Sequence, residues 1–342
     1  MMSKPLDNQR ILDICRYFCV LGLVIPLLIT WKLWTSERVY PMTPLVEGAS
    51  FAFISGNASF AVYAIGMLTL TAALFKKFAL PALATYLTIV AFWIMQDISR
   101  NLIWVYMYNC VALTLLAWSI YQKRHHTQQD PGYINNIRAI ICGTYIWGGI
   151  NKINSYFFGS VFPWFISPII PNITDYELGA LFTIVVPFLE IFIGFGLMFL
   201  KGKERTLPLF IAFGMLCYNL YCLGPLGHNW GISVWSWNLF IFLFTFLLFW
   251  KQGNDVNLKS VLFPKTWLKW PIIICIYIGP ATWYWGIWPT HNSFLMYDGV
   301  RQEASYDIAG NLHHTLPDIL KEVTQKHGNK VHQHHWLSLI HI

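Results

Sequence analysis

The sequence predicts an all-α fold, a polytopic transmembrane bundle of about nine helices with a small extracytoplasmic C-terminal tail. Of its 342 residues, 56% are hydrophobic and only 11% are charged, whereas soluble domains carry about 25% charged residues. Uncharged apolar runs such as 207–223 and 234–250 approach the roughly 20 residues that a helix needs to cross a bilayer core. These runs are apolar on all faces and do not alternate, so they favour helices over the strands of a barrel.

The first apolar run is predicted to be a retained helix and not a cleaved signal peptide. Lys4, Arg10 and Arg16 precede or enter it, and it ends in Trp-Lys-Leu-Trp at 31–34, where a signal peptide would have small residues for cleavage. The nine predicted helices span about 12–34, 51–75, 78–96, 101–121, 136–154, 178–200, 206–223, 232–250 and 269–289.

The basic residues of the connections predict the orientation. One set of alternate loops carries Lys76, Lys77, Lys123, Arg124, Lys201, Lys203, Arg205, Lys251, Lys259, Lys265 and Lys269. The other set carries only Lys32, Arg38 and Arg100. The positive-inside rule therefore places the N-terminus in the cytoplasm, and nine spans place the C-terminus outside. The net charge of +7 is explained by this topology, so we expect membrane lipid and not nucleic acid as the partner, in a bacterial inner (cytoplasmic) membrane.

Two outer segments have their own character. Residues 155–177 hold three prolines and the aromatic run Phe157, Phe158, Phe162, Trp164 and Phe165, which predicts a loop lying along the membrane interface. The predicted domains are a helical domain over 1–290 and a tail over 291–342, with a short strand at 304–308 and an amphipathic helix at 316–327. Eight of the eleven histidines follow residue 290, but their spacing matches no closed zinc pattern, so we expect a solvated tail and no metal site.

Lys152 is the first ionisable residue that the topology does not explain. It lies at the outer end of the fifth predicted helix, after Tyr145, Gly148 and Gly149. A charge near the bilayer midplane costs at least about 2.5–3.5 kcal/mol and usually faces a partner or water. One interpretation is a lysine that extends to the interface. The other is a base, because burial disfavours the ammonium form. The glycine pair would let another helix approach closely.

Glu190 and His228 are the other two candidates. Glu190 lies deep in the sixth predicted helix, three residues after Pro187; it is either a buried structural group or part of a site, and Lys152 is its natural partner because consecutive helices usually pack together. His228 lies with Asn229 and Trp230 in a polar, glycine-rich turn at 224–231, on the same predicted side as Lys152. A solvated loop histidine is the alternative there. Asp97 and Arg100 are spaced to pair, and we expect that pair to be structural.

Several short motifs resemble the HTTM class of membrane proteins. Residues 145–154, Tyr-Ile-Trp-Gly-Gly-Ile-Asn-Lys-Ile-Asn, resemble its Tyr-Phe-x-x-Gly-x-x-Lys-Leu segment and the Gly-x-x-Lys helix of DoxX/MauE proteins. Residues 190–197 are similar to the Glu-x-x-x-Gly helix of DoxX-type proteins, and 227–231 and 293–299 resemble the HTTM outer loop and its exit from the last helix. Together these motifs cover about residues 10–300. The class includes the transmembrane part of vitamin K-dependent γ-glutamyl carboxylase and bacterial SdpB-like proteins.

The resemblance implies that Lys152 is a base that deprotonates a reduced, quinone-like lipid. The large lumenal domain of the carboxylase and its Asn-Asn-His element have no counterpart here, since 96–101 reads Gln-Asp-Ile-Ser-Arg-Asn. Our hypothesis is a protein that acts on a quinol-like molecule or an exported peptide at the outer face. The predicted site residues are Lys152, Glu190 and His228 as catalytic groups, with Tyr145, Gly148, Gly149, Asn229 and Trp230 as the structural motif.

Two alternatives stay open at this point. One is a non-catalytic scaffold of the maturation or immunity type, with a membrane or exported protein as its partner. The other is a proton-coupled transporter with Glu190 as the coupling site. The distances among the three ionisable residues separate a shared site from three unrelated residues.

Overall fold

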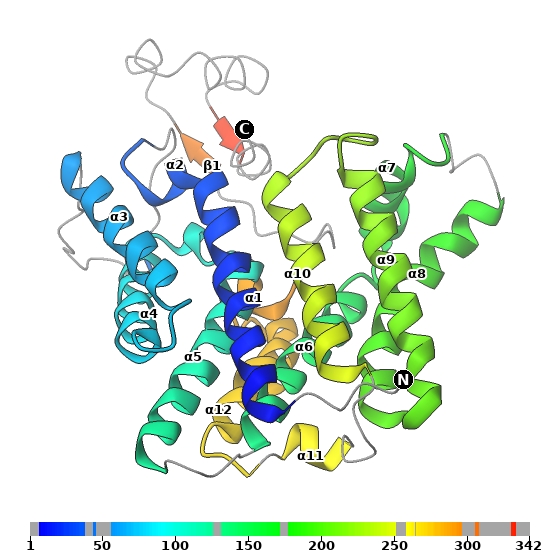
Figure 1. Cartoon of the computed structure of the whole chain (residues 1–342). Helices are drawn as coiled ribbons and strands as arrows, with labels where there is room; N and C mark the ends of the chain where they lie inside the picture. Colours follow the sequence, from blue (N-terminus) through cyan, green and yellow to red (C-terminus); the bar gives the residue numbers. More distant parts are fainter. Residues whose placement is uncertain are drawn as a thin grey trace.

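The computed structural model describes residues 7–37, 44–45, 56–125, 131–171, 177–250, 258–263, 265–295, 305–307 and 330–332. Figure 1 shows a bundle of helices, which confirms the predicted all-α fold class. The first half consists of α1 (Asn8–Ile29), α2 (Trp31–Trp34), α3 (Asn57–Ala72), α4 (Ala79–Gln96), η1 (Ile98–Arg100), α5 (Ile103–Arg124) and α6 (Gly132–Ile150).

The second half continues with helices and ends in two short strands. Its helices are η2 (Phe157–Val161), α7 (Phe162–Ile166), α8 (Glu177–Phe199), η4 (Gly202–Arg205), α9 (Thr206–Leu223), α10 (Ile232–Phe249), α11 (Leu258–Leu262), α12 (Lys269–Ile273), η5 (Ile274–Ile278), α13 (Gly279–Thr282), η6 (Trp283–Trp285) and η7 (Thr290–Ser293). The strands β1 (Ser305–Asp307) and β2 (Lys330–His332) pair in antiparallel register. β1 confirms the strand predicted at 304–308.

Each of the nine predicted segments contains helix, but only six helices of the described residues are long and apolar enough to span a membrane, so the predicted count of nine spans is not confirmed. Within the described residues, six helices have the length and apolar composition of a membrane span: 8–29, 79–96, 103–124, 182–199, 202–223 and 232–249. The other three segments differ for separate reasons. α3 has only 16 residues, which is short for a membrane span. The 269–289 segment is divided among α12, η5, α13 and η6. α6 has too many polar residues for the composition of a membrane span. The protein is a multi-pass membrane protein; its orientation stays a prediction.

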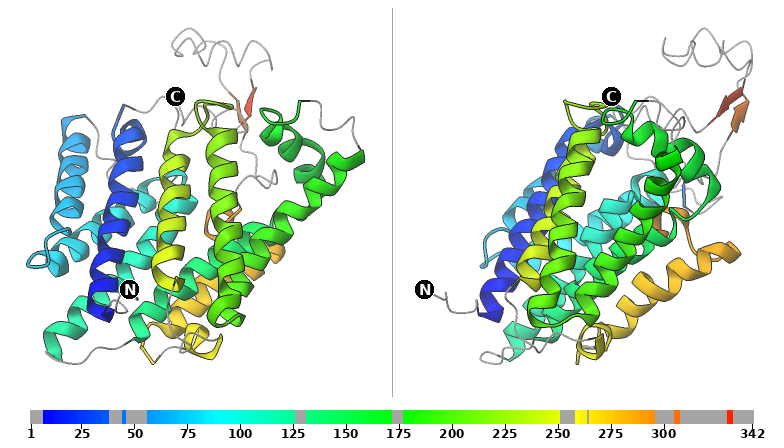
Figure 2. Two further views of the ribbon diagram at one scale, coloured as in Figure 1. Left: turned by 45° about the vertical axis from the view of Figure 1, so that its right-hand side comes forward. Right: turned by 90° about the vertical axis from the view of Figure 1, so that its right-hand side faces the viewer.

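α6 tolerates polar residues because other helices surround it. It packs against α1, α5, α8, α10, α11 and α12, and 15 of its 19 residues are buried. Figure 2 shows it within the bundle, with α3 and α8 at opposite sides. A helix enclosed by protein does not need an apolar face toward lipid, so Asn135, Asn136 and Arg138 can occupy its first half.

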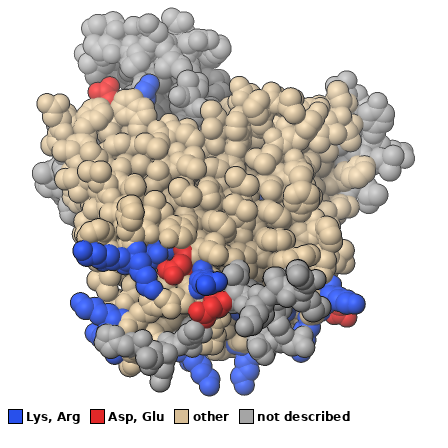
Figure 3. Space-filling view, viewed as in Figure 1, with Lys and Arg blue, Asp and Glu red and all other residues tan. Residues whose placement is uncertain are grey.

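The basic residues gather at one end of the bundle. On the face shown in Figure 3, most Lys and Arg side chains lie toward the end that holds α11 and the start of α1, and β1 lies toward the other end. Two buried arginines there bond to carbonyls at helix ends. Arg138 Nε donates to the Leu248 carbonyl of α10 (3.0 Å), and Arg205 donates to the Leu200 carbonyl directly after α8 (2.8 and 3.1 Å). These bonds satisfy carbonyls that have no partner within their own helices.

The outer segment and the tail depart in part from the expectation. The predicted interfacial loop folds, over its described part, into η2 and α7, and it buries Phe157, Phe162 and Phe165. The contacts of the bundle continue past the predicted boundary at residue 290, since Ser293 and Phe294 are buried in it. The amphipathic helix predicted at 316–327, and most of the histidine-rich tail, lie outside the described residues.

Candidate functional site

The site begins with an unusually close contact between α6 and α8, which glycines permit. A Cβ at Gly149 would lie 2.5 Å from the Pro187 carbonyl oxygen and 2.9 Å from the Ile191 backbone nitrogen. One turn further along α8, a Cβ at Gly194 would lie 2.8 Å from the Cys142 carbonyl oxygen. The two backbones are therefore closer than any side chain at these positions would allow. This confirms the close approach predicted from the glycine pair.

Lys152 and Glu190 form an ion pair at this contact. Lys152 Nζ lies 2.5 Å from Glu190 Oε2. Their side chains are only 10% and 13% exposed, so the charges have little access to solvent. Gly148 leaves room for the carboxylate, because a Cβ there would lie 3.3 Å from Oε2. The predicted pairing of these two residues is confirmed.

The ion pair faces a cavity enclosed by four helices. α6 packs on α8, α8 on α9, α9 on α10 and α10 on α6. The cavity volume is about 70 Å³. Lys152, Glu190, Tyr145 and Gly148 line it on the α6 and α8 side. Tyr218, Asn219, Trp237 and Asn238 line it from α9 and α10. A mostly apolar pocket with a few convergent polar groups is the usual form of a small-molecule site.

The short helical segment 157–166 covers the cavity with aromatic rings. Phe157, Phe162 and Phe165 line it and are almost fully buried. Phe157 and Phe162 pack together with ring centroids 5.9 Å apart. The sequence showed this aromatic run but gave no sign of which rings turn inward, because η2 is a π-helical turn whose side chains do not follow the α-helical spacing.

Phe294 completes the wall from the far end of the chain. Its backbone has a positive φ of 60°, and its buried side chain lines the cavity. Asn151, at the end of α6, holds this region in place. Its Nδ2 donates to the Ser293 carbonyl (2.6 Å) and its Oδ1 accepts from the Tyr284 hydroxyl (3.0 Å). Asn151 was missed as a site residue; its position beside Lys152 was the available signal.

Tyr145 has a fixed position on the cavity wall. Thr245 Oγ1 donates to the Ile241 carbonyl (2.7 Å), so the Tyr145 hydroxyl donates to Thr245 Oγ1 (3.2 Å). This bond joins α6 to α10. Tyr145 is thus a wall residue with its hydroxyl already engaged.

His228 lies on the other side of α7 from the cavity. It does not line the cavity with Lys152 and Glu190. Its ring stacks on Trp164 with centroids 4.3 Å apart at 16°, and its Nε2–H donates to the Trp164 carbonyl (2.6 Å). The turn that carries it is tight, with Asn229 at a φ of +49° and the Trp230 ring 6.0 Å from that of Trp164. His228 therefore contacts the helix that covers the cavity and not the ion pair.

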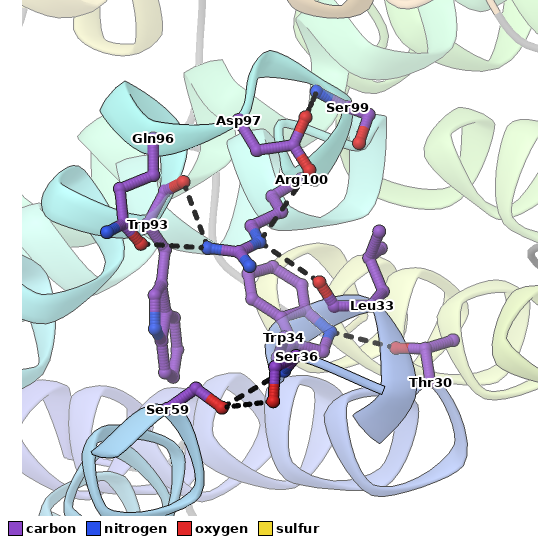
Figure 4. A network of polar contacts seen from close by, with 10 residues as sticks. All are labelled: Thr30, Leu33, Trp34, Ser36, Ser59, Trp93, Gln96, Asp97, Ser99 and Arg100. Carbon is purple, nitrogen blue, oxygen red and sulfur yellow. Dashed lines mark hydrogen bonds and ion pairs between the residues drawn. The ribbon is translucent and has the colours of Figure 1, made fainter. Parts of the chain in front are cut away.

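A second buried polar network lies at the junction of α1, α4 and η1 (Figure 4). Arg100 Nε donates to the Leu33 carbonyl (3.0 Å) and lies 3.8 Å from Asp97 Oδ2. Arg100 also donates to Gln96 Oε1 (3.3 Å), and Asp97 Oδ1 accepts from the Ser99 backbone (3.1 Å). The network joins α2, which directly follows α1, to the end of α4, so the predicted structural pairing is confirmed.

No protein-family model matches this chain, and no curated protein and no solved structure matches it.

Proposed function

We propose that the cavity binds a lipophilic aromatic alcohol of the quinol type and that Lys152 removes the proton of its hydroxyl group. The observation that carries this proposal is the Lys152–Glu190 ion pair (2.5 Å) on the wall of a largely apolar, aromatic cavity. A buried ion pair contributes little to stability compared with apolar residues of the same size. Its presence beside a cavity therefore favours a chemical role.

The proton transfer uses both members of the pair. In the ion pair the proton is on Lys152, so in this proposal the amine acts as a base once that proton passes to Glu190. When the ligand O–H faces Lys152, the amine then takes the ligand proton while the first proton stays on Glu190. The products are an ammonium ion, a neutral carboxyl group and a ligand oxyanion, which the ammonium ion stabilises directly. No electrons are transferred in this step.

The cavity walls support a flat, apolar ligand. Phe157, Phe162 and Phe165 on one side and Phe294 on another present ring faces and edges to the space. Aromatic rings pair with other rings in offset or edge-to-face contacts worth about 0.5–1.5 kcal/mol beyond simple burial. In this proposal His228 is a positioning residue, because it holds α7 through Trp164 and does not meet the ligand.

The test uses 4-nitrophenol, whose phenolate absorbs visible light, in a buffer acidic enough to keep the free probe protonated. We expect the purified wild-type protein to produce the phenolate band on binding. Lys152→Met should bind the probe without this band. Ala212→Phe fills the cavity from α9 and leaves the ion pair intact, so this variant should lose binding itself. Thermal unfolding of each variant verifies that it is folded.

Two results would overturn the proposal. One is a wild-type protein that binds the probe only as the neutral phenol. The other is an equal phenolate band in Lys152→Met. Mass spectrometry of lipids that copurify with the protein identifies the natural ligand class, and we expect a quinone-type lipid in the wild type and its loss in Ala212→Phe.

The resemblance to the HTTM and DoxX-type proteins and the orientation belong to the same proposal. The basic end of the bundle would lie in the cytoplasm and the Lys152 end at the outer half of the bilayer. Reporter fusions at residues 126 and 204 should then report a cytoplasmic location, and a fusion at residue 330 an external one. A cytoplasmic signal at residue 330 would place Lys152 on the wrong side for this proposal.

A further inference from the structure

We propose that Trp237 and Tyr218 form a second polar subsite in the cavity, which binds a hydrogen-bond-accepting oxygen of the ligand, away from the hydroxyl that faces Lys152. This inference rests on the proposed function, since it specifies the ligand of the same cavity. It narrows the ligand class to aromatic alcohols that carry a further oxygen substituent, as hydroquinones and their monoethers do.

The inference begins with two buried polar atoms that lack partners. Trp237 Nε1 and the Tyr218 hydroxyl are buried, and neither finds a hydrogen-bond partner among the described residues. Trp237 is only 8% exposed, and both residues line the cavity. A buried donor without a partner costs about 1–3 kcal/mol, and such groups are rare in folded proteins. A ligand oxygen in the cavity would satisfy these donors.

The neighbouring polar groups are already engaged, so they do not compete for this role. Asn219 Nδ2 donates to Asn238 Oδ1 (2.8 Å), and Asn238 Nδ2 donates to the Val234 carbonyl (2.9 Å). These bonds join α9 to α10, whereas the indole N–H of Trp237 and the hydroxyl of Tyr218 are not engaged by the described residues. An indole N–H can only donate, so the group that it binds must be an acceptor.

The two polar regions lie on different helices of the cavity wall. Lys152 and Glu190 belong to the α6–α8 side of the four-helix ring, while Tyr218 and Trp237 belong to α9 and α10. The Tyr218 ring also packs against Phe165 of the covering segment, with centroids 5.2 Å apart. A ring-shaped ligand that lies between the two sides presents one oxygen to each. A simple phenol reaches only the lysine.

The experiment compares two probes that share the acidic hydroxyl and differ in the second oxygen. 4-Methoxy-1-naphthol carries an ether oxygen, which only accepts hydrogen bonds, and 1-naphthol lacks it. We expect the wild-type protein to bind the methoxy probe about tenfold more tightly, which corresponds to about 1.4 kcal/mol. Trp237→Phe and Tyr218→Phe each keep the ring and remove the donor. Each should reduce the ratio of the two affinities, and the double variant should bring that ratio to about one.

The matched control is Trp147→Phe. Trp147 Nε1 is also buried without a hydrogen-bond partner in the described part of the chain, but Trp147 does not line the cavity. This variant should keep the wild-type ratio of the affinities for the two probes. Thermal unfolding confirms that the variants are folded, and a Trp237→Phe variant that fails to fold is replaced by Trp237→Leu, which also removes the N–H donor.

The outcomes separate this inference from the proposed function. A wild-type ratio near one, or a tenfold ratio that persists in the double variant, overturns the second subsite and leaves the lysine chemistry in place. Wild-type protein that binds neither naphthol overturns both proposals. A phenolate band that depends on Lys152, together with a ratio of affinities that depends on Trp237 and Tyr218, supports both.

Discussion

Replacing Gly149 with alanine tests the close contact that brings Lys152 and Glu190 together. The new Cβ would lie 2.5 Å from the Pro187 carbonyl oxygen and 2.7 Å from Ile191 Cγ1. Bringing the first contact even to 3.0 Å needs a shift of about 0.5 Å between two backbones that cannot rotate out of the way. Overpacking of this kind costs about 1–3 kcal/mol.

Alanine also has a higher helix propensity than glycine, so the control variant must include the same increase in helix stability. Replacing a glycine in a helix by alanine stabilises it by about 1 kcal/mol. Gly214 lies within α9, and a Cβ there meets nothing within 4 Å. Gly214→Ala should therefore gain that 1 kcal/mol without a clash. The free energy of unfolding of Gly149→Ala should lie about 1–3 kcal/mol below that of Gly214→Ala.

The measurement is unfolding of the purified protein in mixed micelles by increasing sodium dodecyl sulfate, followed by circular dichroism. A second readout is the phenolate band of bound 4-nitrophenol, which Gly149→Ala should weaken because separation of the helices stretches the ion pair. Equal stability of the two alanine variants would refute the packing argument. A destabilised Gly149→Ala with an unchanged phenolate band would refute the link between packing and the pair.

Three further predictions concern other contacts. Lys152→Met and Glu190→Gln should each lower the free energy of unfolding by about 3–5 kcal/mol, because each leaves a buried charge alone; in the double variant the losses should not add, and additive losses would contradict the pairing. His228→Ala should increase hydrogen exchange in 157–166 through loss of the stack on Trp164, whereas unchanged exchange would separate the turn from α7. Arg100→Lys should lower the thermal midpoint by losing the bonds of the guanidinium group, and an unchanged midpoint would refute its role in joining α2 to α4.

Much of the bundle could be predicted because bilayer-spanning helices leave a strong signal. Long apolar runs identified the helical segments, and the resulting order of consecutive helices predicted that Lys152 and Glu190 meet. The predictions failed for segments that lack this apolar signal. α6 is enclosed by other helices, so it tolerates polar residues. Its composition therefore lacks the apolar signal of a helix that faces lipid. The division of 269–289 into short helical pieces has no compositional signal of comparable strength.

The candidate site could be predicted only at its charged end. Isolated charges in apolar sequence stand out, whereas the aromatic walls are drawn from a chain with 17% aromatic residues, in which no single ring is conspicuous. Trp237 and Tyr218 become informative only once their missing hydrogen-bond partners are seen. His228 shows a different position from the one expected for a group beside Lys152. Its polar turn attracted attention, but its bond to the Trp164 carbonyl places it behind the covering helix.

The enclosure of α6 also constrains how this protein is made. A helix that carries Asn135, Asn136 and Arg138 gains little from entering lipid alone. Two of the helices that shield it, α8 and α10, follow it along the chain and so leave the ribosome later. The insertion of α6 must therefore be completed together with these later segments. Truncation before α8 should leave α6 outside the membrane, which a glycosylation-site or protease-protection assay would detect, and the candidate site is then assembled only in the last stage of biogenesis.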